Sequence, residues 1–430
     1  MNFLKKNAGK ILIFILSLIP IIFWATTYDL QTKFNTISST FISLTQLSGL
    51  VGFVLFAVNI IIGMRSKILE KFFNSIPDIY KLHRFLGISS FVLLSLHPLF
   101  IIINYLSFSI KFAVDYIFSF TDLSLSLGKI SLIAMFFIIL TTIFLKIKYD
   151  TWKIIHKILS FSFFIGFFHV LVVNSTVSRN MGLRYYLLFL GTITASLAIY
   201  KIIFNINLAK IYKYLVVNIK FINNNSMEIE LSPIDKKIYF KPGQFVFIKI
   251  NQEKLDEEHP FSISSGVNEK NLKITVKNLG DYTLDLRNKL KMNSIVSIDG
   301  PYGDFYTDNK KDKIFIAGGI GITPFLSILK AERTKNNITL FFCAKDKSES
   351  ELINDIKQTQ DIHPNLNIIE IYSSIRDRIS IKDIKSVPNF ENSDIFICAS
   401  SVMMNDIKNQ LINNGFDKKN IYFEDFSFKK

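Results

Sequence analysis

Residues 82–99 read LHRFLGISSFVLLSLHPL and residues 152–172 read WKIIHKILSFSFFIGFFHVLV, and these two apolar stretches decide the fold. Each of them carries two of the six histidines in the chain. His83 and His97 are 14 residues apart, which on an α-helix is a rise of about 21 Å with the two side chains nearly in line. One such helix would hold an imidazole at each of two depths in a membrane.

The second stretch carries a matching pair, His156 and His169, which are 13 residues or about 20 Å apart on a helix. Two facing imidazoles at one depth are the axial ligands of a six-coordinate haem iron, so two layers predict two haem b groups. The alternative is that the histidines are buried polar residues that bridge helices, and the two matched pairs favour haem. An ideal helix places residues 13 apart on different faces, so we expect local over- or underwinding, or a tilt, in the second helix.

The composition divides the chain into two unlike halves. The 430 residues leave room for two or three domains, and 49% of them are hydrophobic. Residues 1–210 carry 19 Lys and Arg against 6 Asp and Glu, whereas residues 211–430 carry 31 against 29. The net charge of +15 therefore lies almost wholly in the apolar half, where membrane topology explains it, and we expect no nucleic-acid binding. Cys343 and Cys398 provide no disulfide framework, as suits a reducing cytoplasm.

Six apolar runs are each near the length needed to cross a bilayer. The first run follows Lys5, Lys6 and Lys10, but no small-residue cleavage site of the A-x-A kind comes after it, so we expect a retained span and not a signal peptide. The runs are residues 11–25, 41–64, 82–106, 125–145, 152–173 and 185–204. They predict an integral membrane bundle of six helices.

The basic residues between the spans predict the orientation of the bundle. With a cytoplasmic N-terminus most of them fall inside, which is the positive-inside bias and also places the C-terminal half in the cytoplasm. His83 and His156 are then the inner pair, and His97 and His169 the outer pair. Four basic residues flank the inner pair, where they would meet haem propionates or anchor lipid headgroups: Lys81, Arg84, Lys153 and Lys157.

Residues after 213 follow a different pattern. Short alternating strands, YLVVNIKFI, SMEIELS, GQFVFIKI, LKITVKN and SIVSIDG, predict a small antiparallel barrel. From residue 313 strands alternate with helices, expected at 322–334, 351–358 and 402–413, which predicts a parallel sheet with helical crossovers. We expect three domains: a six-helix all-α membrane domain at 1–210, an antiparallel β-barrel at 211–308 and an α/β domain at 309–430.

One strand, turn and helix segment is rich in glycine. Residues 314–325 read IFIAGGIGITPF, and Gly318, Gly319 and Gly321 would let backbone amides approach a pyrophosphate at a helix N-terminus. Such a turn serves packing about as often, and its spacing is not that of the standard dinucleotide fingerprint. Four further segments precede it in order: GQFVFIKI at 243–250, HPFSISS at 259–265, GDYT at 280–283 and DGPYG at 299–303.

These segments, in this order, resemble the flavin-binding barrel of the ferredoxin-NADP reductase superfamily. With the six spans and the paired histidines, the chain after about residue 40 resembles the NADPH oxidase and ferric reductase family of transmembrane flavocytochromes b. The resemblance implies that FAD lies along HPFS, whose turn is fixed by Pro260. His259 would lie by the flavin phosphates, Phe261 would pack at the isoalloxazine, and Ser262 would hydrogen-bond its reactive nitrogen edge.

The GDYT segment would contact the FAD pyrophosphate through Gly280, Asp281, Tyr282 and Thr283, according to the same resemblance. The same four residues would equally form an ordinary turn into a helix, capped by the aspartate or the threonine.

The resemblance also implies that the glycine turn, together with Thr323 and Pro324, binds NADPH or NADH. Lys345 stands where the family often has a basic residue for the 2′-phosphate of NADPH, and a solvated lysine is equally compatible with that position. Phe426, or alternatively Phe428, would stack on the flavin until the nicotinamide displaces it.

Two positions depart from the family pattern. The chain reads Cys398-Ala399-Ser400-Ser401 where the family usually reads Cys-Gly-Pro, which puts the usual approach of the nicotinamide in question. Ile101 stands one helical turn after His97, where eukaryotic oxidases of the family have a second histidine. That second difference puts a dioxygen site in question.

The expected function is oxidoreductase electron transfer from NAD(P)H through FAD and two haems to an acceptor outside, in a plasma membrane of bacterial type. Dioxygen giving superoxide is the expected acceptor, because the loops at 26–40, 104–124 and 174–182 are short and hold no Cys or His cluster for a metal complex. A ferric-chelate or quinone reductase with the same electron path is the alternative. A transporter or channel with a regulatory nucleotide domain would also fit six spans, but leaves the histidines and flavin segments unused. We expect membrane lipids around the bundle and no obligatory protein partner.

Overall fold

The computed structural model describes residues 3–27, 29–64, 69, 72–73, 76–145, 149–204, 211–252, 255–306, 309–331 and 336–424. It forms two compact units. One comprises Met1–Phe73 with Asp78–Leu208, and the other comprises Asn74–Pro77 with Ala209–Lys430.

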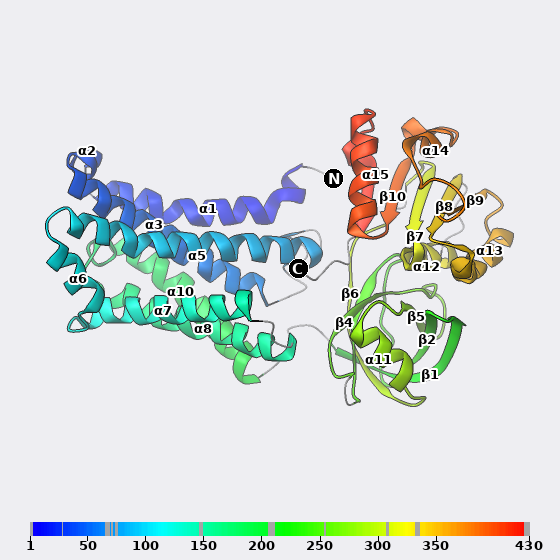
Figure 1. Ribbon diagram of the computed structural model, residues 1–430, viewed down its shortest axis with the longest axis horizontal. Coiled ribbons are helices and arrows are strands. Elements are labelled where there is room, and N and C mark those ends of the chain that lie inside the picture. Colours follow the sequence, from blue (N-terminus) through cyan, green and yellow to red (C-terminus); the bar gives the residue numbers. More distant parts are fainter. Residues whose placement is uncertain are drawn as a thin grey trace. The chain divides into compact units, whose positions relative to one another are not determined.

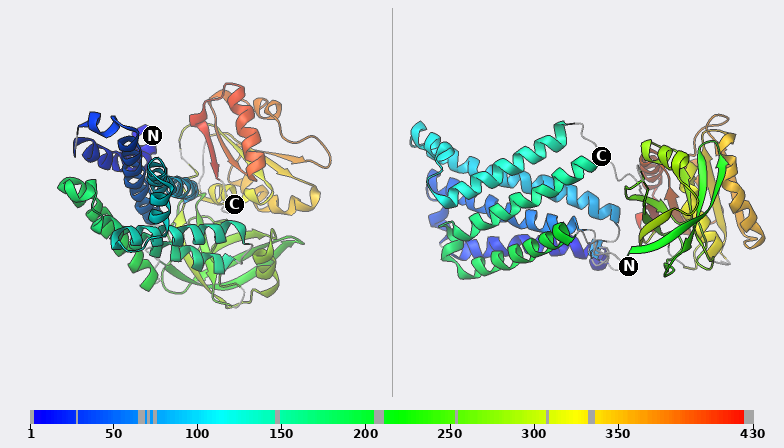
Figure 2. Two further views of the ribbon diagram at one scale, coloured as in Figure 1. Left: turned by 60° about the vertical axis from the view of Figure 1, so that its left-hand side comes forward. Right: turned by 90° about the horizontal axis from the view of Figure 1, so that it is seen from below.

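The first unit contains six long helices that lie alongside one another (Figures 1 and 2). All six are long and apolar enough to cross a membrane, so the six predicted spans are confirmed. Large apolar side chains such as Phe14, Phe137 and Phe189 are exposed, as expected for surfaces that face lipid. The helices are α1 (Phe3–Thr27), α3 (Ile37–Ile62), α5 (Ile76–Leu106), α7 (Leu123–Phe144), α8 (Tyr149–Val172) and α10 (Met181–Phe204).

Polar side chains mark the helix starts and tie neighbouring helices together. Thr36 begins α3 with a reciprocal capping box to Ser39. Ser131 on α7 and Ser162 on α8 each donate a hydrogen bond of 2.8 Å to the other residue's carbonyl oxygen. Inside a bilayer such bonds satisfy hydroxyl groups that lipid cannot.

Three short helices lie in segments that the sequence predicted only as short loops. They are α2 (Leu30–Phe34), α6 (Ile110–Phe118) and α9 (Thr176–Arg179). Each begins at a side-chain cap: Asp29, Ser109 and Ser175 accept from Gln31, Lys111 and Val177 backbone amides.

The second unit begins with the predicted antiparallel barrel, which is confirmed. Its six strands lie in the order β4-β3-β6-β1-β2-β5, and a bridge between Ile263 and Ile274 links the two edge strands. An antiparallel hairpin joins β1 to β2. The strands are β1 (Ile211–Asn223), β2 (Ser226–Pro233), β3 (Phe245–Ile250), β4 (His259–Ser262), β5 (Leu272–Lys277) and β6 (Ile295–Tyr302), and helix α11 is Asp281–Lys289.

A five-stranded parallel sheet follows, as predicted, in the order β11-β10-β7-β8-β9. Alternate residues of its central strand pack into different cores: Phe315 and Ala317 on one face, Ile314 and Ile316 on the other. Burial on both faces explains why the strands read as continuous apolar runs. The strands are β7 (Lys313–Gly318), β8 (Ile338–Ala344), β9 (Leu366–Tyr372), β10 (Asp394–Cys398) and β11 (Ile421–Glu424).

The crossover helices are α12 (Thr323–Ala331) and α15 (Ser401–Asn413), close to the predicted ranges. The helix predicted at 351–358 is present, but only 354–357 is α-helical. That segment is a 3₁₀ helix, η2 (Lys347–Ile353), then a single α-turn, α13 (Asn354–Lys357), and a second 3₁₀ helix, η3 (Gln358–Asp361). Asp346 caps its start through the Ser348 amide, which fixes the tight first turn.

Candidate functional site

Two pairs of histidine rings lie between α5 and α8. The ring centroids of His83 and His156 are 6.0 Å apart, and those of His97 and His169 are 6.4 Å apart. A first-row metal lies about 2.0 Å from the imidazole nitrogen that binds it, and that nitrogen lies about 1.1 Å from the centroid of its ring. Two imidazoles that bind one metal from opposite sides therefore have ring centroids about 6 Å apart. Both pairs have this separation.

Helix α8 reaches both rings of α5 without a break. It is α-helical from Tyr149 to Val172, with no 3₁₀ or π segment. The 13-residue spacing is thus accommodated without a 3₁₀ or π segment, and a tilt of the helix, the other expected explanation, stays a prediction.

Backbone carbonyl oxygens and one aromatic ring hold the imidazoles. A ring whose Nδ1–H donates to a carbonyl keeps its lone pair on Nε2, which is the tautomer that binds a metal. His156 stacks on Trp152, with centroids 5.0 Å apart and planes inclined by 15°. The Nδ1 contacts are His83 to Asn59 O at 3.1 Å, His97 to Thr45 O at 2.8 Å and His169 to Ser124 O at 2.7 Å.

Three glycines let helices α3 and α7 approach these rings. A side chain at any of them would collide with an imidazole or force it to move. A Cβ atom would lie 2.5 Å from His97 Nδ1 at Gly49, 3.1 Å from His83 Cε1 at Gly63 and 3.1 Å from His169 Nδ1 at Gly128.

A cavity of about 780 Å³ adjoins the His97 and His169 rings. Its walls are mostly apolar and include Ile101, and its volume lies within the range of cofactor pockets. Three cationic side chains also line it: Lys33, Lys129 and Arg179. These features together fit a haem. The two imidazoles have the required separation, glycines make room beside them, the cavity is apolar, and the cations would pair with the carboxylates of the haem.

The basic residues predicted around the other pair are mostly at the surface of the helices. Lys81, Arg84 and Lys157 are exposed, and the side chain of Lys153 lies outside the described residues. Lys201 of α10 donates a hydrogen bond of 2.9 Å to the carbonyl oxygen of Gly63. Gly63 in turn lies against the His83 ring.

In the barrel, the HPFS and GDYT segments come together. The rings of His259 and Tyr282 stack at 3.6 Å with planes inclined by 19°, and His259 Nε2 lies 3.0 Å from a carboxylate oxygen of Glu257. Burial, with the Glu257 charge nearby, raises the pKa of Tyr282. HPFS is the edge strand β4, in which Ser262 is buried and Phe261 packs on the barrel core. The predicted flavin-phosphate and pyrophosphate segments are therefore neighbours.

The GDYT segment is also the turn into a helix that the sequence allowed. Gly280 precedes α11 with φ +147°, which favours glycine. The Thr283 hydroxyl accepts from the Leu279 amide at 2.8 Å and donates to the Gly280 carbonyl at 3.0 Å. A Cβ at Gly280 would meet no atom within 4 Å, so the space beside this helix start is open.

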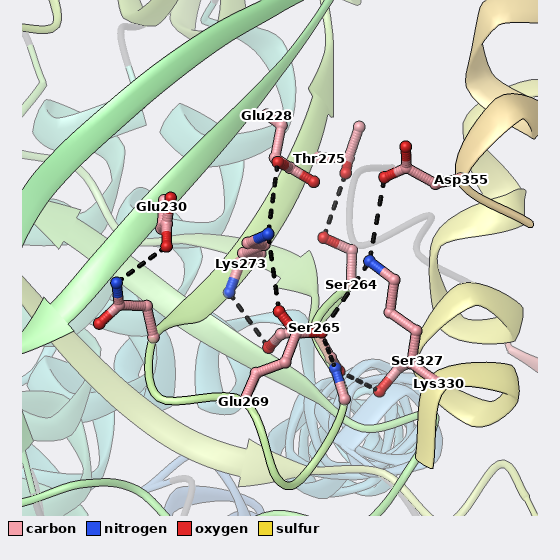
Figure 3. Close-up of polar contacts among 12 residues, drawn as sticks. Glu228, Glu230, Ser264, Ser265, Glu269, Lys273, Thr275, Ser327, Lys330 and Asp355 are labelled. Atoms are coloured by element: carbon pink, nitrogen blue, oxygen red, sulfur yellow. Dashed lines mark hydrogen bonds and ion pairs between the residues drawn. The ribbon is translucent and has the colours of Figure 1, made fainter. Parts of the chain in front are cut away.

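The barrel and the parallel sheet meet in a polar seam just beyond β4 (Figure 3). Ser327 of α12 donates a hydrogen bond of 2.8 Å to the carbonyl oxygen of Ser265, and both residues are fully buried. Lys330, one turn further on α12, lies 3.9 Å from Glu269 of the barrel and 3.9 Å from Asp355. The helix that follows the glycine turn is thus fixed to the barrel at its other end.

The seam continues into the barrel through Lys273, which lies 3.6 Å from Glu269 and 4.0 Å from Glu228 (Figure 3). Glu228 is buried, and burial raises its pKa although Lys273 opposes the shift. Charges therefore alternate in sign along the seam from Glu228 to Asp355.

The three glycines of the glycine turn have different roles. Gly319 has φ +52°, which its turn requires. A Cβ at Gly321 would lie 2.0 Å from the carbonyl oxygen of Cys398, and one at Gly318 would lie 2.7 Å from the Ala399 Cβ. Gly318 and Gly321 therefore serve the packing of β7 against β10, the alternative that the sequence left open.

The other residues predicted to bind the nicotinamide nucleotide come after strands β7 and β8. Thr323 and Pro324 are buried at the start of α12, where the Thr323 hydroxyl donates to the Ile320 carbonyl at 3.1 Å. Lys345 follows β8 and is exposed. Phe426 and Phe428 lie outside the described residues.

Sequence reasoning missed Glu424, the last residue of β11. It is buried, it pairs in register with Cys398, and a Cβ at Gly303 would lie 3.1 Å from its Oε1. Its position two residues before Phe426 is the signal that could have identified it. The buried carboxyl group of Glu424, two residues before Phe426, thus lies beside Cys398 and beside the predicted site segment at 299–303.

Family comparisons match three consecutive parts of the chain. Residues 48–167 match the ferric reductase like transmembrane component, residues 211–306 an FAD-binding domain, and residues 315–409 an oxidoreductase NAD-binding domain. The first match contains three of the four paired histidines, His83, His97 and His156, and ends two residues before His169. The second match ends between β6 and β7, and the third begins within β7.

Relatives of known name match parts of the chain. Ferric reduction oxidase 8, mitochondrial, of Arabidopsis thaliana is 36% identical over 152 residues, covering 32% of this chain and 20% of that protein. The heavy chain of a superoxide-generating NADPH oxidase from Dictyostelium discoideum is 26% identical over 192 residues, covering 38% of this chain and 37% of that protein. The chain thus spans well under half the length of both relatives.

Among solved structures, the flavohem-like FAD/NAD binding domain of nitric oxide dioxygenase from Vibrio cholerae O1 biovar El Tor matches with a TM-score of 0.45 and 23% identity. That match covers 50% of this chain and 98% of that one. The three family matches, in this order along a chain with six membrane-spanning helices, carry the assignment. The chain is an oxidoreductase that carries a ferric reductase like transmembrane component, followed by an FAD-binding domain and an oxidoreductase NAD-binding domain.

Proposed function

We propose that the protein carries electrons from NAD(P)H through FAD and two haem b groups to an acceptor on the opposite side of the membrane. The observation that carries the proposal is that the four histidines lie in two pairs, whose ring centroids are 6.0 and 6.4 Å apart. FAD is the needed adaptor, because hydride chemistry moves two electrons and haem takes one. The N-terminus and both nucleotide domains would lie in the cytoplasm, as the distribution of basic residues favours.

Residues of the chain have distinct roles in this proposal. The four histidines would hold the two haem irons, two histidines to each, so the acceptor would receive its electron without binding the metal. Ser262 would orient the reactive edge of the flavin, with His259 and residues 280–283 holding its phosphates. The glycine turn and Lys345 would hold the nicotinamide nucleotide, and Phe426 would gate access of the nicotinamide to the flavin.

Dioxygen, giving superoxide, is the proposed acceptor. Among the residues that the structure describes, no group of three His, Cys, Asp or Glu side chains could hold a metal ion, so a built site for a ferric complex has little support. A ferric-chelate reductase is the second candidate. It is favoured by Lys33, Lys129 and Arg179 in the cavity beside His97, because these cations would attract an anionic chelate.

An absorption spectrum of the purified full chain in detergent, before and after NADPH, tests the electron path. Reducible haem bands with two haems per chain are expected. His97→Ala or His169→Ala should remove one haem and keep the other, and His83→Ala or His156→Ala should do the reverse. Retention of two haems in any of these variants would contradict the ligand assignment.

The acceptor is decided by NADPH consumption with and without oxygen, scored for superoxide with a dismutase-sensitive probe. Turnover with oxygen alone and dismutase-sensitive product would support the oxidase. If turnover needs an added ferric chelate or quinone, the oxidase proposal fails and the reductase alternative replaces it.

A further inference from the structure

An ion pair joins the barrel to the nucleotide domain at the glycine turn. Lys277, the last residue of β5, lies with its Nζ atom 2.6 Å from the Oε2 atom of Glu349 in η2. Both side chains are about four-fifths buried, with 19% and 18% of their surface exposed. The pair is therefore a well-defined contact and not a mobile surface one.

The pair lies directly against Gly319. A Cβ atom there would be 3.1 Å from Glu349 Oε2 and 3.6 Å from Lys277 Nζ. Gly319 is the glycine of the turn that has a positive φ, and it opens the segment leading into α12. A carboxylate thus lies where the turn would receive the phosphates of a nucleotide, and a lysine from the other domain lies beside it.

A carboxylate at such a turn has an electrostatic consequence. Backbone amides and a helix start favour negative charge, and the Glu349 carboxylate, paired with Lys277, already lies beside this turn. A nucleotide pyrophosphate brought to the same place would be attracted by Lys277 and repelled by Glu349. The two negative groups cannot share one lysine without cost.

We propose that the Lys277–Glu349 pair is a displaceable gate on the nicotinamide nucleotide site: the pyrophosphate of NAD(P)H takes the place of the Glu349 carboxylate beside Lys277. This inference rests on the proposed function, in which the glycine turn binds NAD(P)H. Lys277 of the flavin barrel is then a nucleotide-binding residue, and Glu349 is a competitor that weakens binding. The bound nucleotide, through Lys277, would also couple the two domains.

The other explanation of the pair is a permanent clamp between the domains. Asn223 of the barrel also approaches this segment, with its Nδ2 atom 3.4 Å from the Ser348 carbonyl oxygen. A clamp predicts that loss of either charge weakens nucleotide binding in the same direction. The gate predicts opposite effects from the two residues.

Calorimetric titration of NADP⁺ into the purified full chain in detergent distinguishes these cases, and it does not depend on turnover. Glu349→Gln should bind NADP⁺ about two- to fivefold more tightly, the effect of removing one partly exposed charge interaction. Lys277→Gln should bind it more weakly by a similar factor. Glu351→Gln, an exposed glutamate on the same 3₁₀ helix, is the matched control and should leave the affinity unchanged.

The charge-swapped chain, Lys277→Glu with Glu349→Lys, separates the two explanations even where a single variant folds poorly. It restores an ion pair between the domains, so a clamp predicts normal NADP⁺ affinity. The gate predicts weak binding, because the lysine is no longer on the barrel side. Weaker or unchanged binding by Glu349→Gln, or full recovery in the swap, would overturn the gate. Absence of NADP⁺ and NADH binding by the unchanged chain would overturn the donor site itself, and the gate with it.

Discussion

Gly49 lies directly against the imidazole of His97: a Cβ atom at Gly49 would be 2.5 Å from its Nδ1 atom. That nitrogen also lies 2.8 Å from the carbonyl oxygen of Thr45, one turn earlier on the same helix as Gly49. The ring therefore fits between a carbonyl group and a residue that has no side chain. Its orientation depends on α3 as much as on its own helix.

Gly49→Ala should displace the His97 ring and lower the haem content from two per chain toward one. Gly52→Ala is the matched control, because its Cβ would meet Leu94 of the same neighbouring helix and no imidazole. Haem-to-protein ratios from absorption spectra of both purified variants measure the difference. Equal haem loss in the two variants would mean that helix packing, and not the ring, is responsible.

Lys345→Ala should raise the KM for NADPH about tenfold and leave that for NADH nearly unchanged, because a charge-assisted contact to the 2′-phosphate is lost. Steady-state kinetics with both cofactors measure the effect. Lys347→Ala, an exposed neighbour, is the control. The same rise for both cofactors would remove Lys345 from this role and leave it a solvated lysine.

Glu228→Gln should stabilise the chain at pH 7. Burial raises the folded pKa of Glu228 above its unfolded value. The folded state then binds this proton more tightly, so the contribution to stability is present below the unfolded pKa and is lost as pH rises through the folded pKa. Removing the charge should raise Tm at pH 7 by about 2–4 °C, for roughly 1 kcal/mol in a domain of this size.

The gain from Glu228→Gln should shrink as pH falls toward 4, which thermal scans of the full chain at a fixed rate would detect. Glu230→Gln, two residues along the same strand, is the control and should show no such trend. A gain that is independent of pH would assign the effect to packing and not to ionisation.

Ser327→Ala should destabilise the second unit by about 1–3 kcal/mol, because it takes the hydroxyl donor away from a buried carbonyl group of Ser265. A lower Tm with FAD still bound is the expected result. Ser374→Ala, at an exposed position, is the reference variant. Equal changes in the two variants would show that the buried bond contributes little.

The membrane helices and the alternating strands could be predicted from sequence because their signals are local. An apolar run of membrane length or a strand ending at a glycine turn depends on few neighbours in the chain. The histidine pairing was also open to prediction, since rise per residue converts spacing into depth. The way in which α8 accommodates a 13-residue spacing could not be predicted, because the orientation of two rings toward each other depends on how the two helices pack.

The parts that could not be predicted depend on contacts between distant residues. Lys277 and Glu349 are 72 positions apart, and nothing near either residue signals the other. Helix α6 was missed because its nine residues are too few for a clear periodic pattern in a loop. A helix was predicted at 351–358, but helical structure begins earlier, at Lys347, where the side-chain cap of Asp346 favours a tight 3₁₀ turn.

The spacing of His83 and His97 on one continuous helix makes α5 sensitive to length rather than to composition. Substitutions among the 13 residues between them change contacts with lipid and neighbours but leave both rings at their positions. A single inserted or deleted residue rotates one ring relative to the other by about 100° and shifts it by about 1.5 Å. Sequences that diverge freely in this segment should therefore still keep its number of residues.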